Sequence, residues 1–297
     1  MSKVTKLQQL RQSQSFNKKF GIWVRWAIAV VLIFFSIFPV IWMISAALNP
    51  VSTLATQKLI PEKAGLSNFQ DLIGNPIFPF FTWLWNSVKI STISTILTLT
   101  LTTMAAFAFS RFRFKGRQTM LKSILLIQVF PNLLAIVALF TILKQFGDII
   151  SAIGLNTHLG LIIVYLGGAM GMNIWLMKGY MDTIPRDIDE SAHVDGATNW
   201  QVFWLLILPL LRPILVVIGI LSFIGTYGDF IIARTLLTKS TQQTVMVGLQ
   251  IFTAGQYTQN WGVFAAGALI AALPIMIIYL VLQDQIVGGL TQGAVKG

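Results

Sequence analysis

The class of fold is decided by a stretch without a single charged side chain, Trp26–Gln57 (WAIAVVLIFFSIFPVIWMISAALNPVSTLATQ). A helix needs about 20 apolar residues to cross the hydrocarbon core of a bilayer, so this stretch is long enough to hold one span. It is also too long for the apolar region of a secretory signal peptide, so we expect an uncleaved first span. Four further windows lack charge: Ile90–Ser110, Ser123–Leu143, Ile149–Met177 and Ser240–Gln283.

A sixth apolar stretch, Pro213–Ala233, is interrupted by Asp229 alone, and only Trp261–Gln283 of the last window is apolar enough to span. We therefore predict an all-α integral membrane protein with about six transmembrane helices. The expected spans lie near residues 22–48, 86–110, 120–142, 158–178, 211–233 and 261–283.

The overall composition supports this class. Only 10% of the residues are charged, 55% are hydrophobic and the mean hydropathy is +0.75, whereas soluble domains carry about 25% charged residues. The net charge of +11 does not indicate nucleic-acid binding, because the basic residues punctuate apolar runs instead of forming a stripe on a soluble fold. The sequence contains no cysteine, which excludes disulfides and thiolate sites.

The lysine and arginine distribution predicts the orientation in the membrane. With the N-terminus inside, 15 of the 21 basic residues fall on the cytoplasmic side and six outside, which favours both termini inside. The predicted domains are a cytoplasmic tail (1–21), one transmembrane domain (22–283) and a second cytoplasmic tail (284–297). Within the transmembrane domain, residues 179–209 form a cytoplasmic loop, and residues 49–85 and 234–260 form outer loops.

The cytoplasmic loop holds five of the ten acidic residues of the chain, all between Asp182 and Asp195. Pro185 and the acids after it suit the first turn of a helix. Gly196 permits a tight turn, and Thr198 with Gln201 forms a capping box that starts a second helix. The residues alone leave two interpretations open, a docking site for a partner or a solvated hairpin at the membrane edge.

The run Glu190–Ala197 (ESAHVDGA), followed by Leu206–Pro209 (LILP), resembles the signature of ABC importer permeases. That signature is E-A-A, three residues, G, nine residues, I-x-L-P; Ser191 and Leu206 are mild departures from it. Further stretches resemble the carbohydrate-uptake permeases of the maltose/maltodextrin (MalG) type over nearly the whole chain. These stretches are Trp83–Lys89 (WLWNSVK), Gly154–His158 (GLNTH), Tyr165–Gly168 (YLGG) and Gly289–Gly297 (GLTQGAVKG).

The resemblance implies a type I importer permease fold and a set of contact sites. The cytoplasmic loop would form coupling helices docked on an ATPase subunit, with Glu190 paired to a basic residue there and Gly196 at the turn. The docking residues would be Glu190, Ser191, Ala192, Asp195, Gly196, Ala197, Leu208 and Pro209. A tail at the ATPase interface would include Thr291, Gln292, Gly293 and Lys296. An outer loop that reaches the sugar-binding protein would include Gly248, Gln250, Gln256, Tyr257, Gln259 and Asn260.

The function implied by the resemblance is import of an oligosaccharide by alternating access in a bacterial or archaeal cytoplasmic membrane, with maltose or maltodextrin as the first guess. The implied partners are a second, MalF-like permease subunit, two ATPase subunits and an extracytoplasmic sugar-binding protein. The chain has no phosphate-binding loop and no hydrolase motif, so we expect no catalysis and no cofactor, with ATP and Mg²⁺ bound by the ATPase subunits. The alternative is a secondary transporter or channel that uses Asp229, since an acid within a span is a functional candidate by default.

Overall fold

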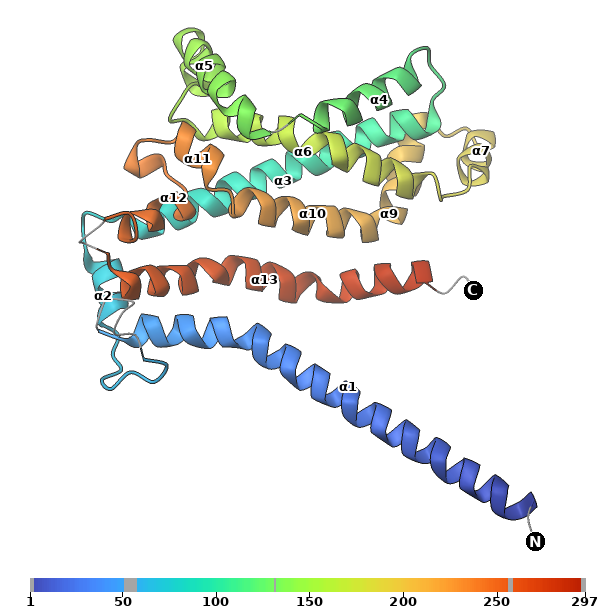
Figure 1. Cartoon of the computed structure of the whole chain (residues 1–297). Helices are drawn as coiled ribbons and strands as arrows, with labels where there is room; N and C mark the ends of the chain where they lie inside the picture. Colours follow the sequence, from blue (N-terminus) through green and yellow to red (C-terminus); the bar gives the residue numbers. More distant parts are fainter. Residues whose placement is uncertain (1–2, 51–57, 131, 256–258, 295–297) are drawn as a thin grey trace.

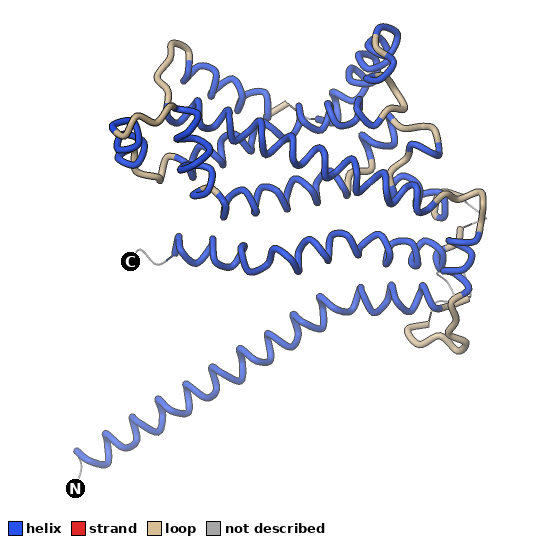
Figure 2. The backbone as a smooth tube through the Cα atoms, turned by 180° about the vertical axis from the view of Figure 1, so that it is seen from behind, coloured by secondary structure: helices blue, strands red, loops and turns tan. Residues whose placement is uncertain are grey.

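The structure is a computed structural model that describes residues 3–50, 58–130, 132–255 and 259–294. Within these ranges the regular secondary structure is entirely helical (Figure 2). The long helices are α1 (Lys3–Leu48), α3 (Phe80–Arg111), α6 (His158–Met181), α10 (Arg212–Tyr227) and α13 (Trp261–Ala294). The shorter ones are α2 (Ser67–Gly74), α4 (Arg117–Gln128), α5 (Asn132–Ile149), α7 (Asp187–Val194), α8 (Asn199–Gln201), α9 (Leu208–Leu210), α11 (Ile231–Leu236) and α12 (Val245–Leu249).

Four helical segments of the described chain are long and apolar enough to cross a membrane: Gly21–Leu48, Phe80–Arg111, His158–Met181 and Trp261–Gln285. A fifth candidate is the pair Asn199–Leu210 and Arg212–Tyr227, whose helix axis bends by 76° between the two segments. These segments match five of the predicted spans. The fifth predicted span ends earlier than expected, because α10 stops at Tyr227 and Asp229 lies in the break before α11.

The stretch expected to form the third span, 120–142, is divided between α4 and α5. In the sequence, Pro131 directly precedes the first residue of α5, and helices tend to end before a proline because the proline ring crowds the preceding residue. Together, α4 and α5 still lead from the end of the bundle that carries α7 to the end that carries α11 (Figure 1). The N-terminal end of α1 and the C-terminal end of α13 lie toward the same end of the bundle as α7.

Helix α3 is the central helix, packed against both α6 and α10. Along its middle, residues 91–103, the buried face carries small hydroxyl residues, among them Ser91, Ser94, Thr98 and Thr102. Small side chains let helix backbones approach closely within a membrane. Some of the hydroxyls bond back to the helix, as in Thr102 Oγ1 to the Thr98 carbonyl oxygen at 2.6 Å.

Helix α1 behaves differently from the rest of the bundle. It packs against α13 near its C-terminal end and diverges from it toward its N-terminal end (Figures 1 and 2). Along the diverging part, large apolar side chains such as Trp23 and Phe35 are exposed in this chain. An apolar helix without a protein neighbour satisfies its own backbone hydrogen bonds and is suited to lipid.

The first turns of α3 fix the outer segment that follows α11. Trp83 Nε1 donates to the Ser240 carbonyl oxygen at 2.8 Å, and Asn86 Nδ2 donates to the carbonyl oxygens of Thr241 and Gln243, each at 3.0 Å. The Val245 amide donates to Ser87 Oγ at 2.8 Å. Trp83 is fully buried, whereas its neighbour Trp85 is exposed. Of the two tryptophans, therefore, only Trp85 is placed as a residue of the membrane interface would be.

We predict that Gly248→Ala loosens this outer segment. A Cβ at position 248 would lie 2.2 Å from Cε3 of the Trp83 indole, which is itself buried and hydrogen-bonded. Overpacking of this kind costs about 1 to 3 kcal/mol, so the melting temperature of the purified protein in detergent should fall. Gly179→Ala is the matched control, because that helical glycine has no heavy atom within 4 Å of its Cβ position. Equal melting temperatures for the two variants would contradict the prediction.

Candidate functional site

The hairpin α7–turn–α8 at one end of the bundle is built as the sequence predicts. Helix α7 ends in a Schellman motif, in which the Ala197 amide donates to the Ala192 carbonyl oxygen at 2.9 Å and the Gly196 amide to that of His193 at 3.0 Å. Gly196 has a φ of +85°, a conformation that L-residues with a side chain rarely adopt. Glycine at this position therefore sets the direction in which the chain leaves α7.

The second helix begins at the predicted capping box. The Gln201 amide donates to Thr198 Oγ1 at 3.3 Å, and the Thr198 amide donates to Gln201 Oε1 at 2.8 Å. After one turn the helix widens into a π-helical segment, Val202–Ile207, before α9. This π segment was not predicted, because i to i+5 hydrogen bonding leaves no clear mark on the apolar pattern.

Five residues, Ser110, Arg111, Asp182, Arg186 and Asp189, hold the hairpin against the end of α3; we call them the α3 clamp. Arg111 Nε lies 2.6 Å from Asp189 Oδ2, and both side chains are largely buried. Arg111 Nη2 also donates to the Ile184 carbonyl oxygen at 3.1 Å, and Arg186 Nη2 donates to the Ser110 carbonyl oxygen at 2.8 Å. Ser110 Oγ donates to Asp182 Oδ1 at 2.6 Å. The clamp thus joins residues about 70 to 80 positions apart in the sequence.

The two carboxylates of the clamp are shifted in opposite directions. Burial raises the pKa of Asp189, and the Arg111 guanidinium opposes that effect. Burial would also raise the pKa of Asp182, but hydrogen bonds from Lys178 and Ser110 outweigh it and lower the pKa overall. Sequence reasoning assigned Asp187, Asp189 and Glu190 alike to the first turn of a helix; it did not identify the partner of Asp189, because Arg111 is remote in sequence.

The exposed tip of the hairpin carries four of the eight predicted docking residues. Glu190, Ser191, Asp195 and Gly196 are exposed, together with the apolar side chain of Val194, which is 88% exposed. Pro209 is exposed, and Ala197 and Leu208 are half-buried. Ala192, also predicted as a docking residue, differs from these: its side chain is buried within this chain, in the same apolar cluster as Met177, Ile184 and Phe203. The reason is that the clamp turns this face of α7 toward α3.

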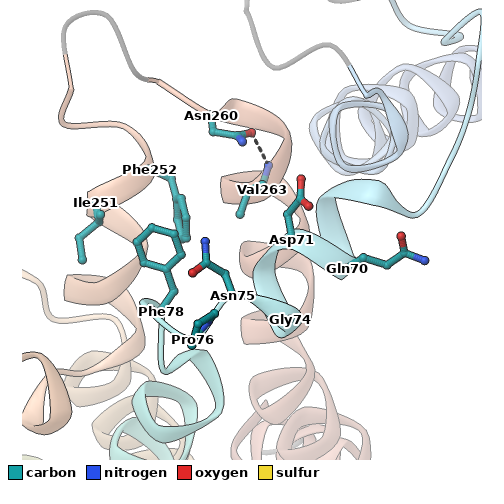
Figure 3. Close-up of a pocket in the computed structure, with 10 residues that line it drawn as sticks. All are labelled: Gln70, Asp71, Gly74, Asn75, Pro76, Phe78, Ile251, Phe252, Asn260 and Val263. Atoms are coloured by element: carbon teal, nitrogen blue, oxygen red, sulfur yellow. Dashed lines mark hydrogen bonds between the residues drawn. The ribbon is translucent and has the colours of Figure 1, made fainter.

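At the opposite end of the bundle, the two predicted outer loops meet around a cavity of about 810 Å³ (Figure 3). Helix α2 and the turn after it supply one wall, and residues 251–252 with the start of α13 supply the other. Phe78 and Phe252, which both line this cavity, pack edge to face with ring centroids 4.8 Å apart. Asn260 Oδ1 accepts a hydrogen bond from the Val263 amide at 3.0 Å, drawn in Figure 3.

The predicted outer-loop residues are in several different settings. Gly248 is buried beneath the Trp83 indole, and Gln250 is half-buried. Gln259 accepts a hydrogen bond from Trp261 Nε1 at 3.0 Å, so Gln259 and Asn260 both stabilise the start of α13. Gln256 and Tyr257 lie outside the described residues. In the predicted C-terminal tail, Thr291, Gln292 and Gly293 continue α13, and Lys296 lies outside the described residues.

Asp229, the basis of the alternative interpretation, lies in the turn between α10 and α11. Its Oδ2 accepts hydrogen bonds from Tyr165 OH and from the Ala233 amide, both at 2.9 Å. One carboxylate oxygen therefore fixes the start of α11 against α6. Among the described residues, His, Cys, Asp and Glu side chains form no group of three or more that could hold a metal ion.

Comparisons with known proteins agree with this arrangement. Residues 98–291 match the family described as binding-protein-dependent transport system inner membrane component. The maltose/maltodextrin transport system permease protein MalG of Vibrio vulnificus (strain YJ016) is 42% identical over 297 residues, covering 96% of this chain and 99% of the relative. The protein of the same name from Escherichia coli (strain K12) is 40% identical over 295 residues, with the same two coverages.

Two solved structures share the fold. One is a chain of a bacterial ABC transporter involved in the import of the acidic polysaccharide alginate, with a TM-score of 0.75, 21% sequence identity, and coverage of 90% of this chain and 96% of that one. The other is a chain of a bacterial alginate ABC transporter in complex with an alginate pentasaccharide-bound periplasmic protein, with a TM-score of 0.61, 19% identity, and coverage of 87% and 92%. Together with the sequence relatives, these findings place the chain: it belongs to the family of inner membrane components of binding-protein-dependent transport systems.

Proposed function

We propose that this chain is a permease subunit of an ATP-driven importer that carries maltose or maltodextrin into the cytoplasm by alternating access. The observation that carries the proposal is the exposed, acidic hairpin tip at Glu190–Gly196, held rigidly on the end of a bundle of spanning helices. The sugar is inferred from relatives at 40 to 42% identity that align over nearly their whole length.

The proposed complex contains a second permease subunit, two ATPase subunits that bind ATP and Mg²⁺, and an extracytoplasmic sugar-binding protein. The hairpin is the docking site for an ATPase subunit, with the Glu190 carboxylate paired to a basic side chain there. The end of α13 around Thr291–Gly293 contacts the ATPase interface on the same side. The outer loop around Gln250 and Asn260 contacts the sugar-binding protein on the other side. This arrangement requires both termini in the cytoplasm, as the distribution of basic residues favours.

The clamp suggests how motion of the ATPase reaches the membrane. Pulling α7 away from α3 would leave the Arg111 and Asp189 charges unpaired in a buried setting, which is costly. The hairpin and α3 therefore move as one body, and α3 packs against α6 and α10. Alternating access needs such packed units, because they shift as rigid bodies between discrete arrangements.

The alternative of a secondary transporter or channel has less support. A proton relay needs acidic or basic groups in succession, whereas Asp229 Oδ2 is engaged by Tyr165 and the Ala233 amide in a structural contact. Uptake by vesicles that contain this chain without nucleotide or ATPase subunits would favour the alternative. Uptake that requires both would support the proposal.

We predict that Glu190→Lys leaves the protein inserted but abolishes coupling. The charge reversal places a cation against a basic pocket, so uptake by the reconstituted complex and its sugar-stimulated ATP hydrolysis should both fall by roughly tenfold or more. Asp148→Lys is the matched control, because Asp148 is an exposed acid near the C-terminal end of α5, remote from the hairpin. Normal uptake with Glu190→Lys would show that the hairpin is not the docking site.

We predict that Arg111→Gln both destabilises the protein and lowers the number of sugar molecules moved per ATP. Breaking a buried ion pair by removing one partner costs roughly 3 to 5 kcal/mol, and the loss would free α7 from α3. Thermal unfolding in detergent measures the first effect, and parallel assays of uptake and ATP hydrolysis measure the second. Arg113→Gln, an exposed arginine two residues away, is the control. The swapped pair Arg111→Asp with Asp189→Arg should recover part of the coupling; a clamp without a role in coupling would leave the ratio unchanged in every variant.

A further inference from the structure

The connection between α3 and α4 carries an unbalanced positive charge. No acidic residue occurs in positions 72–147, whereas five basic residues fall within Arg111–Lys122. The first of them, Arg111, is neutralised by Asp189 in the α3 clamp. Three of the others surround the start of α4, and we call them the basic corner: Lys115, Arg117 and Lys122. None of the three forms an ion pair with a described residue, and both lysines are exposed.

The basic corner sits on an ordered turn at the end of a spanning helix. The candidate span Phe80–Arg111 ends directly before this turn. The rings of Phe112 and Phe114 pack against phenylalanine rings of α3, with centroids 5.6 and 5.8 Å apart. Arg117 Nη1 donates to the Phe112 carbonyl oxygen at 3.4 Å, and Gly116 starts α4 with a φ of +86°. The turn therefore places its charges at the level of the membrane surface.

One face of α4 continues the basic corner with apolar side chains, and we call it the α4 stripe: Lys122, Leu125, Leu126 and Val129. These residues are spaced at i, i+3, i+4 and i+7, so they share one side of the helix. All four are exposed, Leu126 at 73% and Val129 at 78%. Ile127 and Phe130 lie on another side and line an apolar cavity between α5, α6 and α10. The stripe thus leads from a positive charge at the membrane surface onto apolar surface.

This combination selects the chemistry of the occupant. Lysine and arginine bind phosphate groups, and basic residues beside a span attract anionic lipids. A free phosphate or a nucleotide would use the charges alone and leave Leu126 and Val129 without a contact. An anionic phospholipid matches both parts, because its headgroup carries the negative charge and its acyl chains are apolar. A zwitterionic phospholipid gains less, since its net charge is zero.

We propose that the basic corner and the α4 stripe form a binding site for one anionic phospholipid, in the leaflet on the same side as α7. Lys115, Arg117 and Lys122 hold the headgroup phosphate, and Leu126 and Val129 contact an acyl chain. The site goes beyond the proposed function and does not depend on what the protein transports. It places a lipid next to the end of α3 that holds the hairpin.

Quenching by labelled lipids tests the proposal, because the chain contains no native cysteine. Thr119 is exposed and lies on the same side of α4 as Lys122 and Leu126. The full-length Thr119→Cys variant is labelled with a fluorophore and reconstituted in phosphatidylcholine nanodiscs. A small, fixed fraction of either phosphatidylglycerol or phosphatidylcholine carries a nitroxide near the glycerol end of one chain. Phosphatidylglycerol should be enriched at the fluorophore by roughly tenfold.

Removal of two charges should reduce this enrichment. Lys115→Gln combined with Lys122→Gln should lower it by roughly fivefold or more, because each basic residue near an anionic lipid contributes a factor of about five. The matched control is Lys144→Gln combined with Lys239→Gln, which removes two exposed lysines from α5 and from the outer segment after α11. This control has the same net charge and should keep the enrichment.

Thermal unfolding covers the case in which the labelled variant does not reconstitute. Phosphatidylglycerol added to the detergent should raise the melting temperature of the unlabelled protein more than phosphatidylcholine does, because a ligand of the folded state stabilises it. The difference between the two lipids should disappear when Lys115 and Lys122 are both replaced by glutamine, and it should persist in the control.

Four outcomes would overturn the proposal. Equal quenching by the two lipids, or enrichment that survives the loss of Lys115 and Lys122, would show that the basic corner does not select a lipid. Loss of the enrichment in millimolar inorganic phosphate would show a site for a free anion. Loss of the enrichment when the partner subunits are added would show that this surface binds protein.

Discussion

The buried ion pair between Arg111 and Asp189 is the interaction on which the arrangement of the cytoplasmic end depends. Each charge is tolerable there only because the other is present. The pair therefore fixes the position of α7 relative to α3, and through the apolar cluster around Ala192 it also fixes the π-helical segment that follows. A hairpin that rested on apolar contacts alone would be free to slide. The ion pair gives it a single register.

Helix α3 is fixed by polar contacts at both of its ends. At the outer end, Trp83, Asn86 and Ser87 hold the main chain of residues 240–245; at the inner end, Ser110 and Arg111 hold the hairpin. Between these ends the inward face carries small hydroxyl residues that allow α6 and α10 to pack closely. One helix thus connects the segment proposed to meet the sugar-binding protein with the segment proposed to meet the ATPase.

The sequence predicted those features that depend on local chemistry. The charge-free windows located the spans, and Gly196, Thr198 and Gln201 located the hairpin turn and the start of its second helix, as the backbone geometry confirms. What it did not predict depends on contacts between distant residues. Asp189 and Arg111 are 78 positions apart, Trp83 and Ser240 are 157 apart, and neither pair follows a periodic pattern. The inward orientation of Ala192 follows from the first of these contacts, so it could not be predicted either.

The bend of 76° between the segment Asn199–Leu210 and α10 also has a mechanical consequence. A push delivered along the axis of the first segment is nearly perpendicular to the axis of the second. Most of this displacement therefore moves the inner end of α10 sideways, within the plane of the bilayer, and little of it moves the helix along its own axis. Motion of the first segment along its own axis would therefore open or close the bundle laterally, and no helix has to slide through the lipid.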